Sequence, residues 1–176
     1  KGQTLYSTGK GTTPEYALNY VLGKSGIDPD SGLDIEYKSE ATEVAAAMGQ
    51  AQGDLALLPQ PFATTVLMQN PDLRVALSLS DEWDKVGGGS ALVTGVVVVR
   101  SDWLAQNTQA YDRFMADYAL STEYVNQNPA EVAPWIEELG IAKAAVAEKA
   151  IPQCNIVCIT GEDMKQKAGG YLSALH

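Results

Sequence analysis

A run of glycine and hydroxyl residues near the start of the chain is the segment best suited to bind a small molecule. A glycine turn that leads from a strand into a helix exposes backbone N–H groups to an anion, and Ser, Thr and Lys side chains add donors. Pro14 suits the first turn of such a helix, with Thr13 as the expected N-cap. We therefore predict ligand contacts from this run, which comprises Ser7, Thr8, Gly9, Lys10, Gly11, Thr12 and Thr13. A capped helix with a tight entry turn would explain the same residues without a ligand.

This loop does not match the common nucleotide-binding motifs. No Gly-Lys-Ser/Thr follows its first glycine at the P-loop spacing, and Pro14 stands where the dinucleotide motif has its last glycine. The sequence therefore disfavours a nucleotide site.

Two later segments offer further contacts. Gln60 and Pro61 follow a short apolar stretch, and the Gln60 amide can both donate and accept hydrogen bonds. Ligands of open α/β sheets gather beyond the carboxyl ends of the strands, so we expect both residues on the same edge as the glycine loop. Trp83, in an acidic segment, could stack on a flat solute there. A rigid proline turn and a core tryptophan are the alternative interpretations.

Residues for catalysis or metal binding are scarce. The only histidine is His176, the last residue, so neither a Ser-His-Asp nor a Cys-His arrangement can form within the fold. The carboxylates of residues 81–84 adjoin one another, which is typical of a solvated acidic loop. Cys154 and Cys158 are compatible with two free thiols, one or both buried, or with a local disulfide. We predict no catalytic residue, no metal site and no cofactor.

The elements that must position these residues alternate along the first hundred residues. Period-two and apolar runs predict strands, and helical spacing predicts the segments between them. The strands are expected at 4–7, 33–37, 54–58, 73–79 and 91–99, and the helices at 13–22, 40–51 and 62–69, with a polar loop at 80–90. This order predicts an open, mainly parallel sheet with helices on both faces.

The remainder of the chain has a different character. Helices are expected at 108–126, 129–139 and 143–151, a short strand at 155–160 and a last helix after it. We therefore predict an α/β domain over residues 1–100 and a helical segment over 101–176 that packs on a part absent from this chain.

Composition narrows the class of partner. The 176 residues are 45% hydrophobic and carry a formal net charge of -10, which disfavours nucleic acid as a partner. No run of 18 apolar residues is present, and the chain opens at Lys1 as if trimmed, so the lack of a signal peptide does not bear on export.

Taken together, these segments resemble the solute-binding proteins of ABC importers, in the group that serves nitrate, sulfonates, taurine and thiamine pyrimidines. The resemblance spans nearly the whole chain and rests on the order and spacing of several loose motifs. They are Lys-Gly-Gln-Thr-Leu at 1–5, Gly-Lys-Gly-Thr-Thr-Pro-Glu-Tyr at 9–16, Gly-Asp-Leu-Ala-Leu-Leu-Pro-Gln-Pro-Phe-Ala at 53–63, Thr-Gly-Val-Val-Val-Val-Arg-Ser-Asp-Trp-Leu at 94–104 and Tyr-Val-Asn-Gln-Asn-Pro-Ala-Glu at 124–131. Gln60 departs from the acid that the family often has there.

The resemblance implies a type II periplasmic-binding-protein lobe, extracytoplasmic, whose first lobe would precede Lys1. Such a protein captures a sulfonate, nitrate or pyrimidine-like solute between two lobes and delivers it to ABC permease subunits. It meets the membrane only through a lipid anchor outside this chain. The alternative is the ligand-sensing domain of a LysR-type regulator. The pyrimidine-synthesising enzymes related to this family need an active-site histidine and a cysteine cluster, which this chain lacks.

Overall fold

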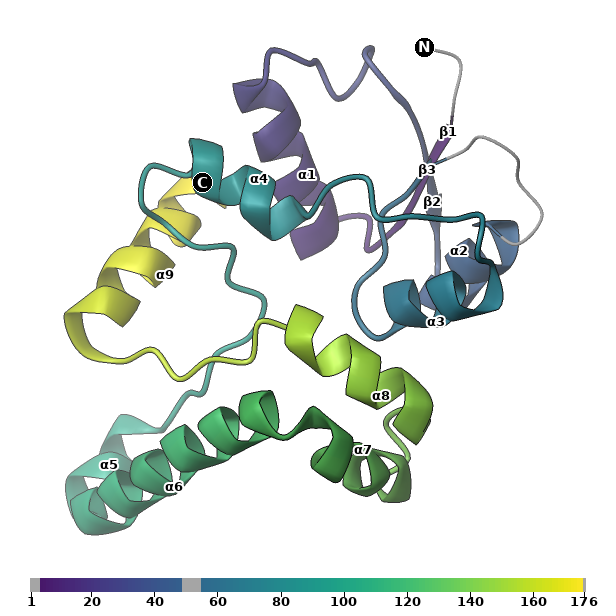
Figure 1. Ribbon diagram of the computed structural model, residues 1–176. Helices are drawn as coiled ribbons and strands as arrows, with labels where there is room; N and C mark the ends of the chain where they lie inside the picture. The colour runs from purple at the N-terminus through teal and green to yellow at the C-terminus, as the bar shows by residue number, and fades with distance from the viewer. Residues whose placement is uncertain (1–3, 49–54, 176) are drawn as a thin grey trace. The chain divides into compact units, whose positions relative to one another are not determined.

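The structure is a computed structural model that describes residues 4–48 and 55–175 (Figure 1). Its elements in chain order are β1 (Thr4–Thr8), α1 (Thr13–Lys24), β2 (Asp34–Lys38), α2 (Ala41–Met48), β3 (Leu55–Ala56), α3 (Phe62–Gln69), α4 (Leu79–Val86), α5 (Ser101–Gln106), α6 (Thr108–Gln127), α7 (Pro129–Glu138), α8 (Ala144–Ala150), the 3-10 helix η1 (Ile151–Gln153) and α9 (Gly161–Leu175).

The three strands in the described part of the chain form one parallel sheet in the order β2-β1-β3. Leu5 of β1 lies opposite Ile35 of β2 and Leu55 of β3. A helix separates each pair of consecutive strands, because parallel strands need a crossover connection. The predicted α/β class with a parallel sheet is therefore confirmed, and the sheet is small. Its assignment to a type II lobe stays a prediction.

Helices cover both faces of this sheet. In Figure 1, α1 lies on one side of the strands and α2 on the other. The helix α1 packs against β1, whereas α2 contacts all three strands and α3. The side chains buried beneath these helices are apolar: Leu5, Leu18, Val44, Met48 and Val66.

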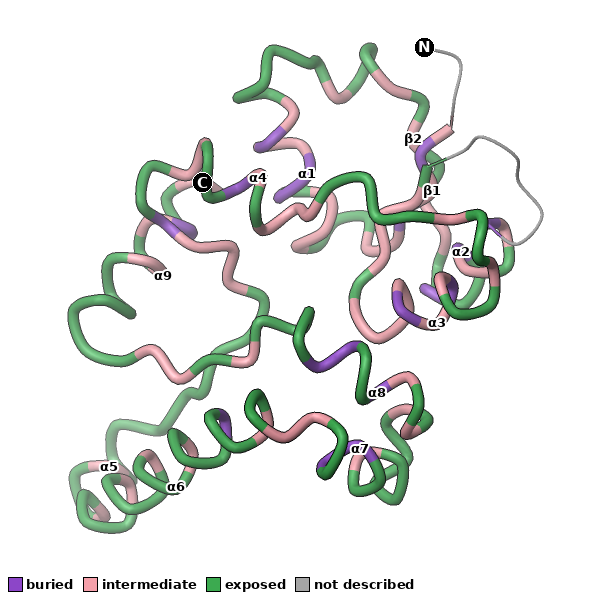
Figure 2. The backbone as a smooth tube through the Cα atoms, in the orientation of Figure 1, coloured by how far each residue is buried: buried purple, intermediate pink, exposed green. Residues whose placement is uncertain are grey.

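A second core joins α1, α4 and α9. Trp83 is fully buried there, with its ring 4.6 Å from that of Tyr20 and 5.3 Å from that of Tyr171. The Trp83 indole N–H donates to Ser90 Oγ at 3.0 Å. Figure 2 shows buried residues in purple on the helices that contribute to this core.

The chain divides into two compact units. Unit 1 comprises Lys1–Thr94 and Gly161–His176, and unit 2 comprises Gly95–Thr160. The core of unit 2 is built from α7, α8 and η1, through Val132, Ala133, Ala147, Ala150 and Ile151. The division differs from the predicted one, 1–100 and 101–176, because α9 packs on α1 and so returns to unit 1.

Three predicted strands are wrong. Residues 73–78, 91–99 and 155–160 form no strand in the described structure. The side chains of Val96 and Val98 are 68% and 84% exposed. A β-branched run has the propensity for a strand, but a strand also needs a neighbour to pair with, and the described residues pair none with these segments.

The predicted polar loop at 80–90 is largely the helix α4. Its N-cap is Ser78, whose Oγ accepts the Asp81 N–H at 3.3 Å. The acidic residues Asp81 and Glu82 lie in the first turn and Lys85 in the last, an arrangement that complements the helix dipole. The short helix α5 was not predicted.

The helices predicted around residues 13–22, 62–69, 108–126, 129–139 and 143–151 are confirmed. The helix predicted at 40–51 is present over Ala41–Met48, and its last residues lie outside the described part of the chain, as do residues 1–3 and 176. No helix within residues 4–48 or 55–175 is long and apolar enough to cross a membrane.

Candidate functional site

The carboxyl ends of the three strands place the predicted loops on one edge of the sheet. Thr8 and Lys38 pair at the ends of β1 and β2, and the Leu57 N–H donates to Tyr6 O at 2.8 Å just beyond β3. The glycine turn after β1, the end of β2 and the Gln60 turn therefore leave the sheet at the same edge.

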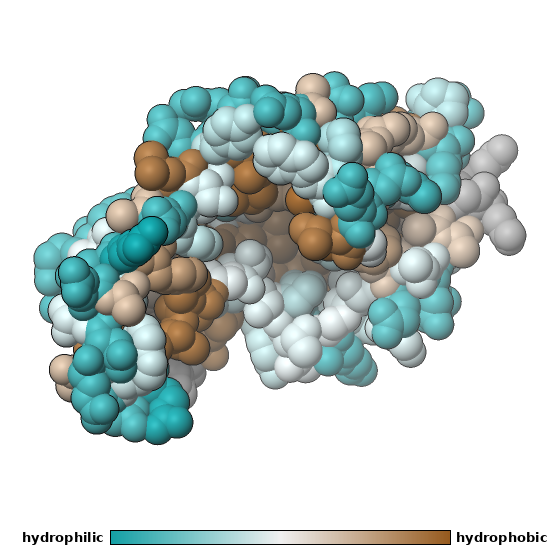
Figure 3. Space-filling view, turned by 90° about the horizontal axis from the view of Figure 1, so that it is seen from below, coloured by the Kyte–Doolittle hydropathy of each residue, from teal (hydrophilic) through white to brown (hydrophobic). Residues whose placement is uncertain are grey.

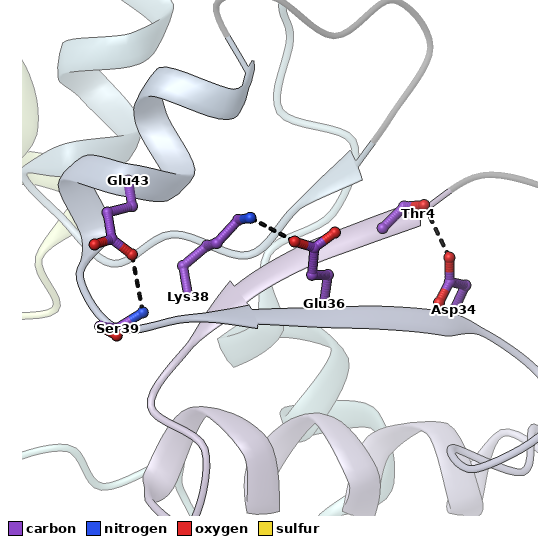
Figure 4. Close-up of polar contacts among 6 residues, drawn as sticks. All are labelled: Thr4, Asp34, Glu36, Lys38, Ser39 and Glu43. Carbon is purple, nitrogen blue, oxygen red and sulfur yellow. Dashed lines mark hydrogen bonds and ion pairs between the residues drawn. The ribbon is translucent and has the colours of Figure 1, made fainter.

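Polar contacts hold the edge strand β2 in place (Figure 4). Thr4 Oγ1 donates to Asp34 Oδ2 at 3.0 Å at the start of the strands. Lys38 forms an ion pair with Glu36 near the other end, and its Nζ lies 5.5 Å from the centroid of the Tyr6 ring. Lys38 thus contacts Glu36 of its own strand and Tyr6 of the neighbouring strand β1.

The glycine turn is a tight loop whose own groups satisfy one another. The Thr12 N–H and Oγ1 both donate to Gly9 O, at 2.9 and 2.6 Å. Gly9 has φ +73, and a Cβ there would lie 2.5 Å from Thr12 Oγ1. Glycine is required at this position because both the backbone angle and the space exclude a side chain. Lys10, Gly11 and Thr12 are exposed.

A carboxylate occupies the entrance to α1. Glu15 Oε2 accepts the Gly11 N–H at 2.5 Å. The Glu15 carboxylate also takes a hydrogen bond from the Tyr37 hydroxyl, at the end of β2. Glu15 therefore links the glycine turn to the neighbouring strand, and it holds a backbone N–H that an anionic ligand would need.

Tyr37 and Lys10 form the second part of this edge. Lys10 Nζ lies 5.8 Å from the centroid of the Tyr37 ring, within range of a cation–π contact. Burial raises the pKa of Tyr37 above its ordinary value of 10.0, and the charge and hydrogen bond of Glu15 raise it further. The phenol therefore stays protonated at neutral pH and can donate a hydrogen bond.

Gln60 marks the third loop. Its Oε1 accepts from the Thr64 N–H at 3.3 Å and from Thr64 Oγ1 at 2.8 Å, so the side chain closes the start of α3. The Gln60–Pro61 peptide bond is cis, and Pro61 is the N-cap residue of that helix. Both residues are partly exposed on the edge.

The same kind of closure occurs at all three helix entries on this edge. In the second loop, Glu43 Oε2 accepts the Ser39 N–H at 3.1 Å (Figure 4). Two of the three closures use a carboxylate, from Glu15 and Glu43, and the third uses the Gln60 amide oxygen. The edge therefore carries acceptors at the positive ends of its helices, where an anion would otherwise be favoured.

Two predicted ligand contacts are wrong. Trp83 is fully buried between Tyr20 and Tyr171, so its ring cannot stack on a solute. Ser7 is also fully buried, and its hydroxyl donates to Thr8 O at 3.2 Å. The predicted N-cap Thr13 is the first helical residue instead, and the N-cap is Thr12.

Two residues of this edge were missed. No contact was predicted for Glu15, and Tyr37 was predicted only as part of the strand at 33–37. The signal for Glu15 was its place three residues after the N-cap, where a Glu commonly turns back to a free N–H. The signal for Tyr37 was its position near the carboxyl end of a strand, where the predicted ligand-binding loops also begin.

The remaining chemistry of the chain lies elsewhere. The described residues hold no group of three or more His, Cys, Asp and Glu that could bind a metal ion. Cys154 and Cys158 are free thiols, and neither is buried. Partial burial raises the pKa of Cys154. Two cavities, of about 450 and 350 Å³, are lined by unit 2, and no residue of the sheet edge lines either.

Comparison with known proteins identifies the fold. No protein-family model matches the chain. No curated protein matches it either. The crystal structure of an ABC transporter from Parabacteroides distasonis superimposes with a TM-score of 0.79 at 24% sequence identity, over 99% of this chain and 60% of that one. This chain thus spans less than two thirds of that protein. What the likeness shows is that the chain has the fold of an ABC transporter protein.

Proposed function

We propose that this chain is the solute-capturing part of an ABC importer, located outside the cytoplasm, and that it acts by binding and not by catalysis. Its solute is a small heterocyclic or anionic molecule, which it delivers to ABC permease subunits. One observation carries the proposal: the glycine turn, Tyr37 and the Gln60 turn converge on one edge of the sheet, in a fold similar to that of an ABC transporter.

The proposal includes a second wall for the solute. Lys10, Gly11 and Thr12 are exposed, and Tyr37 and Gln60 are partly exposed. The similar ABC transporter chain has 40% of its length unmatched by this one, because the match covers 60% of it. We infer that a further lobe, as in type II binding proteins of the nitrate, sulfonate and thiamine-pyrimidine group, closes over this edge and buries the solute.

The groups on the edge favour a heterocycle over a bare anion. Glu15 already takes the Gly11 N–H, and Pro14 contributes no N–H at the helix entry. Lys10 supplies one cation, and the Gln60 amide supplies both a donor and an acceptor. A flat heterocycle with donors and acceptors on its rim would match these groups and pack on the Tyr37 ring, whereas nitrate or a sulfonate would meet the Glu15 carboxylate.

Thermal shift and calorimetry with pyrimidines, nitrate and sulfonates test this proposal. A ligand present at a hundred times its Kd stabilises the folded chain by about 2.7 kcal/mol, which raises Tm measurably. Lys10→Met should weaken the best ligand by about tenfold, the equivalent of ~1.4 kcal/mol. Lys24→Met is the matched control, because Lys24 is also exposed and its Nζ lies 5.4 Å from the ring of Tyr20, away from the edge.

The outcomes separate the solute classes. If nitrate or a sulfonate binds more tightly than any pyrimidine, the preferred solute is an anion and not a heterocycle. The sheet edge remains the binding site in that case, provided that Lys10→Met weakens the binding of the anion. A ligand whose affinity is equal in the Lys10→Met, Tyr37→Phe and parent proteins would remove this edge from the binding site.

A further inference from the structure

The carboxylate of Glu15 is held by donors from two different segments of the sheet edge. Its Oε2 accepts the Gly11 N–H, and the carboxylate also accepts the hydroxyl of Tyr37. Gly11 belongs to the turn before α1, whereas Tyr37 belongs to β2, so the carboxylate is positioned from two sides. Glu15 nevertheless remains partly exposed. The edge therefore presents a carboxylate in a defined position that a solute can reach.

This carboxylate can accept further hydrogen bonds. The two oxygens of an ionised carboxylate offer about four lone-pair sites, all of them acceptors. The Gly11 N–H and the Tyr37 hydroxyl use two of these sites, and no other donor among residues 4–48 and 55–175 is bonded to Glu15. Two adjacent N–H groups fit a carboxylate as a pair of parallel hydrogen bonds, as the fork of an arginine does. A solute with such a pair would therefore match Glu15.

The same carboxylate opposes an anion at the start of α1. The N-terminus of a helix would otherwise favour negative charge. Here, however, the Gly11 N–H is used by Glu15, and the Thr12 N–H and Oγ1 donate to Gly9 O. An anion would thus meet a carboxylate at a turn whose own donors are already bonded. Repulsive groups of this kind commonly set specificity together with attractive ones.

Lys10 complements Glu15 on the same aromatic ring. Lys10 Nζ lies 5.8 Å from the centroid of the Tyr37 ring, and the hydroxyl of that ring bonds Glu15. The strands run downward to this edge in Figure 1, and Figure 3, drawn from below, shows hydrophilic and apolar side chains next to one another on its face. A flat ring with polar groups on its rim can use both kinds of surface. Its N–H donors would face Glu15, and an oxygen acceptor would face Lys10.

From this arrangement we propose that Glu15 determines which class of solute the edge accepts. The solute is a neutral heterocycle whose rim carries two adjacent N–H donors followed by an oxygen acceptor, and Glu15 excludes anions. The inference rests on the proposed function, because it names the solute of the same site.

Three pyrimidines test this selectivity on the unaltered chain. Isocytosine is neutral and carries an amino group beside a ring N–H, with a carbonyl oxygen on the same rim. In NMR titrations of the isotope-labelled chain, it should bind at least tenfold more tightly than its analogue that lacks the exocyclic amino group. It should exceed by a similar factor the affinity of orotate, a pyrimidine that carries a carboxylate. These comparisons need no variant, so they do not depend on whether a substitution disturbs folding.

A matched pair of variants assigns the selectivity to one carboxylate. Glu15→Gln keeps an oxygen that can accept the Gly11 N–H, but it removes the charge and one acceptor oxygen. Isocytosine should bind this variant about tenfold more weakly, and orotate should bind it more tightly than it binds the parent. Glu43→Gln is the control, because Glu43 likewise accepts the Ser39 N–H at the entry to α2 on this edge. It should leave the preference for isocytosine unchanged, and circular dichroism verifies that both variants are folded.

The possible failures are distinguishable. Equal affinity for isocytosine and its analogue, tighter binding of orotate than of isocytosine, or an equal effect of Glu15→Gln and Glu43→Gln would overturn this inference. The proposed function would stand in each of these cases, provided that Lys10→Met weakens the ligand that binds. If no ligand binds, or if Lys10→Met and Tyr37→Phe leave every affinity unchanged, the proposed function fails and this inference fails with it.

Discussion

Gly9 and Gly11 occupy the same turn with nearly the same backbone angle, but only Gly9 is crowded. Their φ values are +73 and +76, and an added Cβ would meet Thr12 Oγ1 at 2.5 Å from Gly9 and nothing within 4 Å from Gly11. Gly11→Ala should therefore lower the free energy of unfolding by only about 1–2 kcal/mol, because a residue with a Cβ is strained in the left-handed conformation. Gly9→Ala should cost about 1–3 kcal/mol more, because Thr12 or Pro14 must also move. Urea unfolding of the two variants measures the difference, and equal midpoints would show that the turn is not packed as described.

The phenol of Tyr37 should make the fold sensitive to alkaline pH. Its pKa is raised above 10.0 in the folded protein, by burial first and then by Glu15. Above pH 10 the folded protein therefore holds more protons than the unfolded chain, so this contribution to stability is constant below pH 10 and falls as the pH rises further. Absorbance at 295 nm, as the difference between the parent and Tyr37→Phe, reports this titration. Glu15→Gln should lower the pKa of Tyr37, and an unchanged titration would separate Glu15 from the phenol.

At the scale of single residues, composition and spacing predicted which loops share the sheet edge, but they did not predict the side-chain contacts within the fold. The glycine turn and Gln60 were predicted on a common edge from the rule for parallel strands, and the pairing of β1 with β3 brings their loops there. Trp83 could not be placed in the same way. Its burial depends on Tyr171, which is 88 positions further along the chain, and no local pattern predicts a contact of that range.

Two adjacent glycines of α9 differ in how closely they approach the rest of unit 1, and only Gly170 lies in close contact with it. A Cβ on Gly170 would lie 2.7 Å from Ser90 Cβ, whereas a Cβ on Gly169 would meet nothing within 4 Å. Both glycines lie inside the helix, where alanine is the better helix former by about 0.5–1 kcal/mol. Gly169→Ala should therefore stabilise unit 1 by about that amount.

Gly170→Ala should act in the opposite direction and cost about 1–3 kcal/mol, because Ser90 holds the Trp83 indole and cannot yield freely. Differential scanning calorimetry of the two single variants compares them directly. A rise in Tm for both would mean that α9 does not approach Ser90 closely.

At the scale of elements, helices were easier to predict than strands. The helical segments of unit 2 satisfy their backbone hydrogen bonds locally, so the spacing of apolar residues and the breaks at Asn128 and Gly140 were sufficient. The valine run at 96–99 carries strong strand propensity, but pairing requires a second segment, and the described residues supply none. The acidic segment 81–84 was predicted as part of a polar loop, whereas the structure places it in a helix that Ser78 caps.

At the scale of the whole molecule, the decisive feature is that the chain leaves unit 1 at residue 94 and returns at residue 161. A purely sequential division could not predict this, because the return depends on Tyr171 meeting Trp83 and not on any change of composition. The consequence is that residues 1–94 do not complete their own core. The last helix must be present for Trp83 to be shielded from water.

Substitutions of two adjacent residues of α9, which face in different directions, test that dependence. Tyr171 is buried against Trp83, and Leu172 is 60% exposed. Tyr171→Ala should destabilise unit 1 by about 3 kcal/mol through the cavity it leaves, whereas Leu172→Ala should change stability by less than about 0.5 kcal/mol. With Trp103 and Trp135 replaced by Phe, the emission of Trp83 reports unit 1 alone.

A chain that ends at residue 160 extends the same test to the whole molecule. If α9 completes the core, the truncated chain should show red-shifted Trp83 emission without denaturant, because water then reaches the indole. If residues 101–176 instead formed one separate body, removing 161–176 would leave Trp83 buried and its emission unchanged. Blue emission from Trp83 in the truncated chain would therefore assign α9 to the other unit and restore the sequential division at residue 100.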